Sequence, residues 1–243
     1  MNHPPECSLI WDLDNTIVRC SEYYIGAKNK FALMACENTG ISQDIALGIL
    51  EAIDAQSIKI DGFGRSRFPK SFQAASAAID VLMGKVPSKT RGKKAWSMGN
   101  SVFTAPYKLY DGAYDALKDI KDMGFKMFLC TKGDAQVQAR KIRINNLNTI
   151  FPEEHIYIDT IKNESHFTKI ILGHNIPSCN VIAIGDSLKD DIGSANKAGI
   201  RSIHVEGQFD GKWTYEDENH HTSDWSVNRI GEVPGLLRGI FKL

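Results

Sequence analysis

Two carboxylates follow a short apolar run near the start of the sequence. The run SLIW (8–11) leads into Asp12 and Asp14, and Asn15 and Thr16 come next. In an extended chain alternate residues point to the same side, so both carboxylates leave the strand together. They repel each other unless a cation compensates, and Mg²⁺ takes carboxylate and phosphate oxygens in one coordination shell. The pattern indicates a cation site, although Asp14 and Asn15 alone also suit an ordinary turn.

A second apolar run ends in the same way. The run VIAIG (181–185) leads into Asp186, and Asp190 and Asp191 lie a short step further on. Ligands of parallel α/β sheets bind just beyond the carboxyl ends of the strands. Two strand ends that carry carboxylates therefore predict a shared metal site, to which either Asp190 or Asp191 contributes.

Two further runs are followed by groups that suit phosphate. Thr131 and Lys132 follow KMFLC (126–130), and Lys162 follows IYI (156–158). A threonine hydroxyl donates to a phosphate oxygen, and a lysine brings a compact positive charge on a flexible stem. Each of these residues alone is typical of a surface loop, but their combination with the carboxylates predicts a phosphate-binding site.

A sheet of parallel strands is needed to bring these residues together. The near-continuous apolar runs lie at 8–11, 126–130, 156–158, 181–185 and 201–205. Such runs are typical of strands that helices cover on both faces. Helical patterns over 113–124 and 194–199 lie between them and end at Gly124 and Gly199. This alternation predicts an α/β fold with a doubly wound, Rossmann-like parallel sheet.

Residues 18–105 interrupt the alternation, because they contain no comparable run. Helical patterns lie there at 21–38, 42–56 and 69–84. We expect a helical cap domain of residues 18–105, inserted after the first strand of a core domain that comprises residues 1–17 and 106–243. The segment 85–100 carries five basic residues and no acidic one. It is expected to be a solvated loop, with contact to an anionic substrate or partner as the alternative.

Three basic residues of the predicted cap lie among aromatic residues. They are Arg65, Arg67 and Lys70, in GFGRSRFPKSF (62–72). One of them, with Arg67 preferred, is expected to contact the substrate. The alternative is a solvated turn after Gly62 and Gly64.

The composition excludes little but favours a soluble cytoplasmic protein. The chain has 243 residues, 42% hydrophobic and 24% charged, with a formal net charge of zero. This balance gives no support for binding to nucleic acid or to a membrane. Five scattered cysteines without a CxxC pair, no signal-like N-terminus and no apolar stretch of ~20 residues agree with that view. A monomer and a homodimer are both compatible with the sequence.

The four strand ends together resemble a known family. DLDNT, LCTKGD, Lys162 and GDSLKDDI match, in order and spacing, the four motifs of the haloacid-dehalogenase superfamily. The resemblance covers the whole chain, including a helical cap after the first motif. It implies a phosphatase in which Asp12 is the nucleophile and Asp14 the general acid and base. An aspartate at position 14 points to phosphoryl transfer from oxygen rather than to removal of halide from carbon.

The resemblance also implies the remaining roles. Mg²⁺ would be held by the Asp12 carboxylate, the Asp14 backbone carbonyl and Asp186, supported by Asp191 according to the motif spacing or else by Asp190. Thr131 and Lys162 would bind the phosphoryl oxygens of a small phosphorylated metabolite, and the cap would close over the site and select the substrate.

Three alternatives stay open at the level of sequence. The first is a phosphomutase of the same superfamily, which returns the phosphoryl group to a sugar. The second is a phospho-acceptor without catalysis, although such receiver domains carry the acceptor aspartate mid-chain and lack a long helical insert. The third is a degenerate member kept for protein binding, which would have no physical reason to retain mutually repelling carboxylates.

Overall fold

The computed structural model describes residues 6–62, 64–206 and 221–243. The chain divides into two compact units, one of Met1–Arg19 with Tyr107–Leu243 and one of Cys20–Pro106. The sequence had placed these boundaries after residues 17 and 105. Within the described ranges no helix is both long and apolar enough to cross a membrane.

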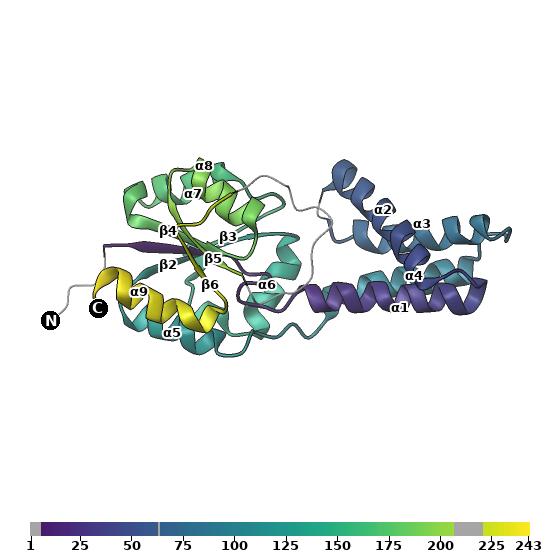
Figure 1. Ribbon diagram of the computed structural model, residues 1–243, viewed down its shortest axis with the longest axis horizontal. Helices are drawn as coiled ribbons and strands as arrows, with labels where there is room; N and C mark the ends of the chain where they lie inside the picture. The colour runs from purple at the N-terminus through teal and green to yellow at the C-terminus, as the bar shows by residue number, and fades with distance from the viewer. Residues whose placement is uncertain (1–5, 63, 207–220) are drawn as a thin grey trace. The chain divides into compact units, whose positions relative to one another are not determined.

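The first unit is built on a parallel sheet (Figure 1). Its described strands are β1 (Ser8–Trp11), β2 (Lys126–Lys132), β3 (Ile156–Asp159), β4 (Val181–Gly185), β5 (Arg201–Val205) and β6 (Trp225–Val227). Their spatial order is β3-β2-β1-β4-β5-β6, and every neighbouring pair is parallel. The predicted α/β fold with a parallel sheet is confirmed, and β6 adds a short edge strand that the sequence did not reveal.

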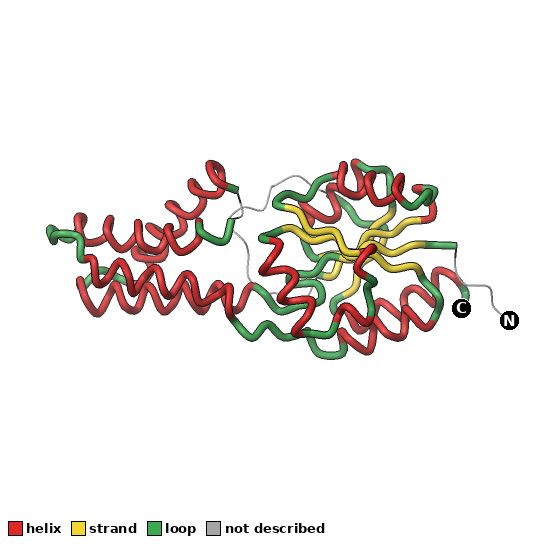
Figure 2. The backbone as a smooth tube through the Cα atoms, turned by 180° about the vertical axis from the view of Figure 1, so that it is seen from behind, coloured by secondary structure: helices red, strands yellow, loops and turns green. Residues whose placement is uncertain are grey.

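Helices cover both faces of this sheet (Figure 2). The described helices are α5 (Ala113–Asp122), α6 (Ala135–Ile144), α7 (Glu164–Gly173), α8 (Ser194–Lys197) and α9 (Val233–Phe241). In Figure 1, α7 and α8 lie on one face, and α5 and α9 lie on the other. A sheet covered in this way buries both faces of each central strand, which explains the near-continuous apolar runs.

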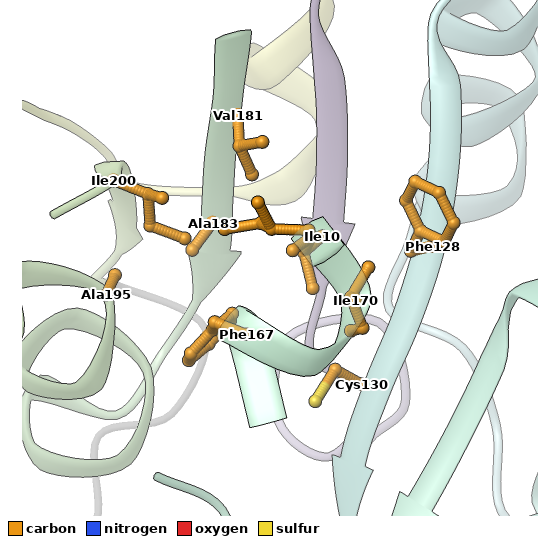
Figure 3. Close-up of a cluster of buried hydrophobic side chains, with 10 residues drawn as sticks. Ile10, Phe128, Cys130, Phe167, Ile170, Val181, Ala183, Ala195 and Ile200 are labelled. Atoms are coloured by element: carbon orange, nitrogen blue, oxygen red, sulfur yellow. The ribbon is translucent and has the colours of Figure 1, made fainter. Parts of the chain in front are cut away.

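A cluster of buried hydrophobic residues shows how the strands and helices pack. Ile10, Phe128 and Ala183 come from three adjacent strands and pack against Phe167 and Ile170 of α7 (Figure 3). All five side chains are buried. Burial of this apolar surface fixes α7, and with it the loop between β3 and α7.

The order of the strands determines where the candidate site residues lie. β1 is central, with Trp11 opposite Leu129 of β2 on one side and Ile184 of β4 on the other. The backbone N–H of Asp12 continues this ladder and donates to the Ile184 carbonyl at 2.9 Å. The residues that follow β1, β2 and β4 therefore emerge side by side at one edge of the sheet.

The second unit is helical. Its described helices are α1 (Ser21–Thr39), α2 (Gln43–Asp61), α3 (Arg67–Leu82) and α4 (Lys89–Ser101). α1 packs on α2 and α4, and α3 packs on the same two helices. In the interior of this helical unit, the rings of Phe31 and Phe68 both contact the ring of Phe72. A helical segment after the first strand is thus confirmed.

The expected loop over 85–100 is wrong, because α4 occupies most of it. The buried face of α4 carries only small residues, Gly92, Ala95 and Gly99. A Cβ on Gly99 would lie 2.9 Å from the Cα of Pro69. The helix is therefore held by close approach to α3 rather than by large apolar side chains, which leaves little hydrophobic signal in the sequence.

Candidate active site

Asp12 lies at the end of the central strand with its carboxylate held by a lysine. The Lys162 Nζ donates to Asp12 Oδ1 at 2.9 Å, and both residues are buried. Lys162 comes from the segment between β3 and α7, where Asn163 caps α7 by accepting from the Ser165 N–H. The cap and the buried face of α7 fix the start of the helix, so the lysine is held at the carboxyl edge of the sheet.

Three carboxylates gather around this position. Asp12, Asp186 and Asp191 each offer an oxygen that lies within 4.8 Å of the others. Asp186 directly follows β4 and accepts from the Thr16 hydroxyl at 3.1 Å. Asp191 lies in the π-helical turn η5 (Leu188–Gly193), accepts from the Ser187 N–H at 3.0 Å and contacts the Lys162 ammonium.

Asp190 lies outside this cluster. Its carboxylate contacts the Lys132 ammonium in an ion pair. Of the two aspartates that the sequence left open, the structure brings Asp191 to the carboxylates and turns Asp190 toward Lys132. Lys132, expected to bind substrate, forms this ion pair with Asp190, and its role in binding stays a prediction.

Burial and mutual repulsion disfavour the charged forms of Asp12 and Asp186 in this cluster. Burial raises the pKa of Asp12 to about 7, and the charge of Asp191 adds to this shift while Lys162 opposes it. Burial and the charges of Asp12 and Asp191 also raise the pKa of Asp186 well above its ordinary value. Burial disfavours the ammonium of Lys162, but Asp12 and Asp191 outweigh that effect and raise its pKa. The site has an excess of buried negative charge.

The donor set fits a hard divalent cation. Three carboxylate oxygens stand close together, and in the described chain one ammonium, that of Lys162, contacts two of them. Oxygen donors of this kind suit Mg²⁺, and a dication balances the carboxylate charge that Lys162 leaves over. Asp12, Asp186 and Asp191 are the residues whose carboxylates would hold it, and the expected contribution of the Asp14 backbone carbonyl stays a prediction.

Asp14 lies on the loop that follows β1. The next residue, Asn15, has φ of 61°, a left-handed conformation that asparagine tolerates better than most residues. The Asn15 N–H donates to the Val18 carbonyl at 2.7 Å, which closes the turn. The Asp14 carboxylate is bound by Lys141, whose Nζ lies 2.7 Å from Oδ1 and 2.8 Å from Oδ2.

Gln138 joins Asp14 to Thr131. Its Nε2 lies 3.0 Å from Asp14 Oδ2 and 2.7 Å from Thr131 Oγ1. Thr131 is buried and is the penultimate residue of β2. By accepting from the amide, the Thr131 oxygen leaves its own hydroxyl hydrogen available for an acceptor such as phosphate.

Sequence reasoning missed both Gln138 and Lys141. They lie three residues apart on α6, whose buried residues are Val137, Gln138, Lys141 and Ile142. The available signal was a glutamine and a lysine on the apolar face of a helix that follows a motif strand. Such residues are seldom buried without a partner.

Arg67, expected to touch the substrate, is buried within the helical unit. Its guanidinium forms an ion pair with Asp54 of α2 and donates to the Ser57 hydroxyl at 3.1 Å. The side chains of Arg67 and Asp54 are only 6% and 5% exposed. The structure gives Arg67 a structural partner, and contact with a substrate stays a prediction.

A parallel α/β core with carboxylates at the ends of β1 and β4, and a lysine before α7, defines a class of hydrolases. The family model described as "haloacid dehalogenase-like hydrolase" matches residues 8–199. The chain belongs to this family, and the resemblance noted in the sequence is confirmed.

Relatives along the whole chain agree with that assignment. A protein of Methanopyrus kandleri named glyceraldehyde 3-phosphate phosphatase is 22% identical over 243 residues, covering 97% of this chain and 98% of its own. A haloacid dehalogenase-like family hydrolase from Xanthomonas campestris has a similar fold, with a TM-score of 0.77 and 20% identity over 99% of this chain and 94% of its own. A putative hydrolase of the same family from Bacillus subtilis, solved bound to magnesium, has a TM-score of 0.63 and 16% identity, covering 98% and 100% of the two chains.

Proposed function

We propose that the protein is a Mg²⁺-dependent phosphatase that hydrolyses a small phosphate monoester through an aspartyl-phosphate on Asp12. The observation that carries the proposal is the position of Asp12. Its carboxylate ends the central strand, is held by Lys162, and lies beside Asp186 and Asp191. Asp14 follows two residues later on a separate turn, which supplies a second carboxyl group for proton transfer.

In the first step Asp12 acts as the nucleophile. One of its carboxylate oxygens attacks phosphorus, an Asp12–O–P bond forms, and the bond from phosphorus to the ester oxygen breaks. Lys162 keeps the carboxylate in place through its contact with Oδ1. The Thr131 hydroxyl and the Lys162 ammonium stabilise negative charge that spreads over the phosphoryl oxygens.

Asp14 moves the protons in both steps. It gives its proton to the departing ester oxygen, which leaves as an alcohol. Asp14 is then a carboxylate and takes a proton from the water that attacks phosphorus. The bond between Asp12 and phosphorus breaks, inorganic phosphate leaves, and both aspartates return to their starting states.

Asp12, Asp186 and Asp191 would hold the metal ion. When bound, Mg²⁺ supplies positive charge that keeps the buried Asp12 carboxylate ionised and neutralises the phosphate next to it. The raised pKa of Asp12 in this cluster supports the need for such a charge, because a protonated carboxyl group is a poor nucleophile.

The proposed substrate is a small phosphorylated metabolite. The name of the Methanopyrus kandleri relative supports including triose phosphates among the esters tested. At 22% identity that name suggests a substrate class to test and does not carry a particular substrate over to this chain.

The test is release of inorganic phosphate from p-nitrophenyl phosphate and from a panel of metabolite monoesters. Each ester is assayed with Mg²⁺, with EDTA, and with the variant Asp12→Asn. The matched control is Asp115→Asn, which changes an exposed aspartate of α5. We expect turnover with Mg²⁺ that EDTA abolishes, that Asp12→Asn lowers by at least ~10³-fold, and that Asp115→Asn leaves unchanged.

Two results would overturn the proposal. One is the absence of phosphate release from every ester by a folded protein that binds Mg²⁺. The other is undiminished turnover in Asp12→Asn. Transfer of the phosphoryl group to a sugar without release of phosphate would favour the mutase alternative.

A further inference from the structure

Helix α6 presents a glutamine and a lysine to the loop after β1. Gln138 and Lys141 are each 1% exposed, although glutamine and lysine are usually found at protein surfaces. They are three residues apart, so they lie on the same face of the helix. Asp134 caps the helix by accepting from the Gln136 and Val137 N–H groups, which fixes the first turn.

Lys141 and Gln138 on this face donate hydrogen bonds to the Asp14 carboxylate, and both carboxylate oxygens accept one. Lys141 Nζ contacts Oδ1 at 2.7 Å and Oδ2 at 2.8 Å, and Gln138 Nε2 contacts Oδ2 at 3.0 Å. Lys141 is itself placed by Tyr107, because its Nζ lies 4.6 Å from the centre of that ring. The Asp14 side chain is nevertheless 25% exposed, so the carboxyl group is held firmly while it stays accessible.

Gln138 is fixed from a second direction. Its Nε2 also contacts Thr131 Oγ1 at 2.7 Å and the Lys132 carbonyl at 3.1 Å. A Cβ on Gly133 would lie 3.1 Å from the Gln138 side-chain amide carbon, so the absence of a side chain there leaves room for this arrangement. One amide group thus sets the distance between Asp14 and the Thr131 hydroxyl.

We infer that Lys141 and Gln138 are positioning residues, which aim the Asp14 carboxyl group at the leaving oxygen of the substrate and hold it in register with Thr131. The inference rests on the proposed phosphatase function. A general acid must lie within hydrogen-bond reach of the atom that it protonates, and small displacements are costly to the rate. Because Lys141 contacts both oxygens, one of them still accepts its hydrogen bond whichever oxygen carries the proton.

Packing alone does not account for this arrangement. Burial of an ammonium group costs free energy that a well-packed apolar side chain would avoid. A methionine would fill similar space on the buried face of α6 without that cost. The pair Lys141–Asp14 is therefore better explained by the orientation it gives to Asp14 than by stability of the core.

The test compares two esters that differ in their need for a proton on the leaving group. Dinitrophenyl phosphate releases a stable phenolate, whereas phenyl phosphate releases a basic phenolate that benefits from protonation. For Lys141→Met, we expect kcat/KM on phenyl phosphate to fall roughly 10–100-fold and kcat/KM on dinitrophenyl phosphate to fall less than about threefold. The ratio of the two values does not depend on the fraction of folded enzyme.

Gln138→Met provides a second variant. It removes contacts to both Asp14 and Thr131, so we expect a loss on both esters and a larger one on phenyl phosphate. The matched control is Arg143→Met, which removes an exposed cation from the same helix. It should leave both values as in the wild type.

An equal loss on the two esters, or no loss, in both Lys141→Met and Gln138→Met would overturn the inference. Failure of the proposed function would look different. In that case the wild-type protein itself would hydrolyse neither ester with Mg²⁺, and the inference would fall with it.

Discussion

A Cβ on Gly185 would lie 2.1 Å from Oδ2 of Asp191, so the last residue of β4 leaves the space that this carboxylate occupies. No side chain beyond hydrogen fits there without moving Asp191. Asp191 in turn contacts Lys162, which donates to the Asp12 carboxylate. A backbone position that looks featureless in the sequence thus controls the carboxylate cluster.

Gly185→Ala should therefore damage the metal site while the sheet stays intact. The methyl group displaces the Asp191 carboxylate, and we expect the Mg²⁺ concentration for half-maximal activity to rise roughly 10–100-fold. The measurement is phosphate release as a function of Mg²⁺. Gly235→Ala in α9, where a Cβ meets nothing within 4 Å, is the control and should behave as the wild type. An unchanged Mg²⁺ requirement in Gly185→Ala would contradict the role of Asp191.

The pKa of Asp12 predicts a pH dependence of stability in the metal-free protein. Its folded value of about 7 lies above the ordinary 3.8, so between these values the folded state keeps a proton that the unfolded chain has lost. The stability from this proton is fully present below about pH 4 and is lost as the pH rises to about 7. Asp12→Asn resembles the protonated form at every pH, so its advantage over the wild type should grow between pH 4 and pH 8 by about 1 kcal/mol or more.

Urea unfolding in EDTA at several pH values measures this difference. Asp115→Asn is the control, because it changes an exposed aspartate and should show no such trend. A difference between Asp12→Asn and wild type that stays constant or shrinks with rising pH would show that the Asp12 carboxyl group is not destabilised by its surroundings.

Magnesium should stabilise the wild-type protein against unfolding. In the proposed function Mg²⁺ binds the folded protein through Asp12, Asp186 and Asp191, and binding at 100 times the dissociation constant would add about 2.7 kcal/mol. We expect Mg²⁺ to raise the Tm of the wild type at pH 7.5 and to have little effect on Asp186→Asn. A Tm that Mg²⁺ raises equally in both proteins would place the metal elsewhere.

Substitution of Arg67 distinguishes a structural role from a role in substrate binding. Arg67→Met leaves Asp54 buried without its cation, so we expect a loss of about 3 kcal/mol in stability of the helical unit. Arg67→Met combined with Asp54→Leu should recover most of it. Lys59→Met, an exposed lysine of α2, is the control for thermal unfolding. A raised KM with unchanged Tm would instead support the predicted contact with the substrate.

Much of the fold follows from local patterns in the sequence. The strands that contain Thr131 or directly precede Asp12 and Asp186 are buried on both faces, and their unbroken apolar runs identify them. The shared sheet edge follows from parallel strands, since all of them end on the same side. For the same reason the sequence could group these residues before the structure was known.

The missed features depend on contacts between distant segments. Gln138 and Lys141 meet Asp14 across more than 120 positions of the chain, a separation of 124 and 127 residues. Helix α4 buries only glycine and alanine, and β6 has three residues. Neither element therefore gives a clear periodic pattern of apolar residues in the sequence. The choice between Asp190 and Asp191 also needed the structure, because it depends on how the π-helical turn η5 directs two adjacent side chains.

The central claim is that the phosphoryl group passes through Asp12, and a rapid acid quench during turnover of dinitrophenyl phosphate tests it most directly. Reduction of the quenched protein with borohydride converts an aspartyl-phosphate to homoserine, which peptide mass spectrometry locates. We predict homoserine at position 12 in the wild type with Mg²⁺, and none in EDTA or in Asp12→Asn. Sustained turnover with Asp12 unmodified, or modification at another aspartate, would contradict the account.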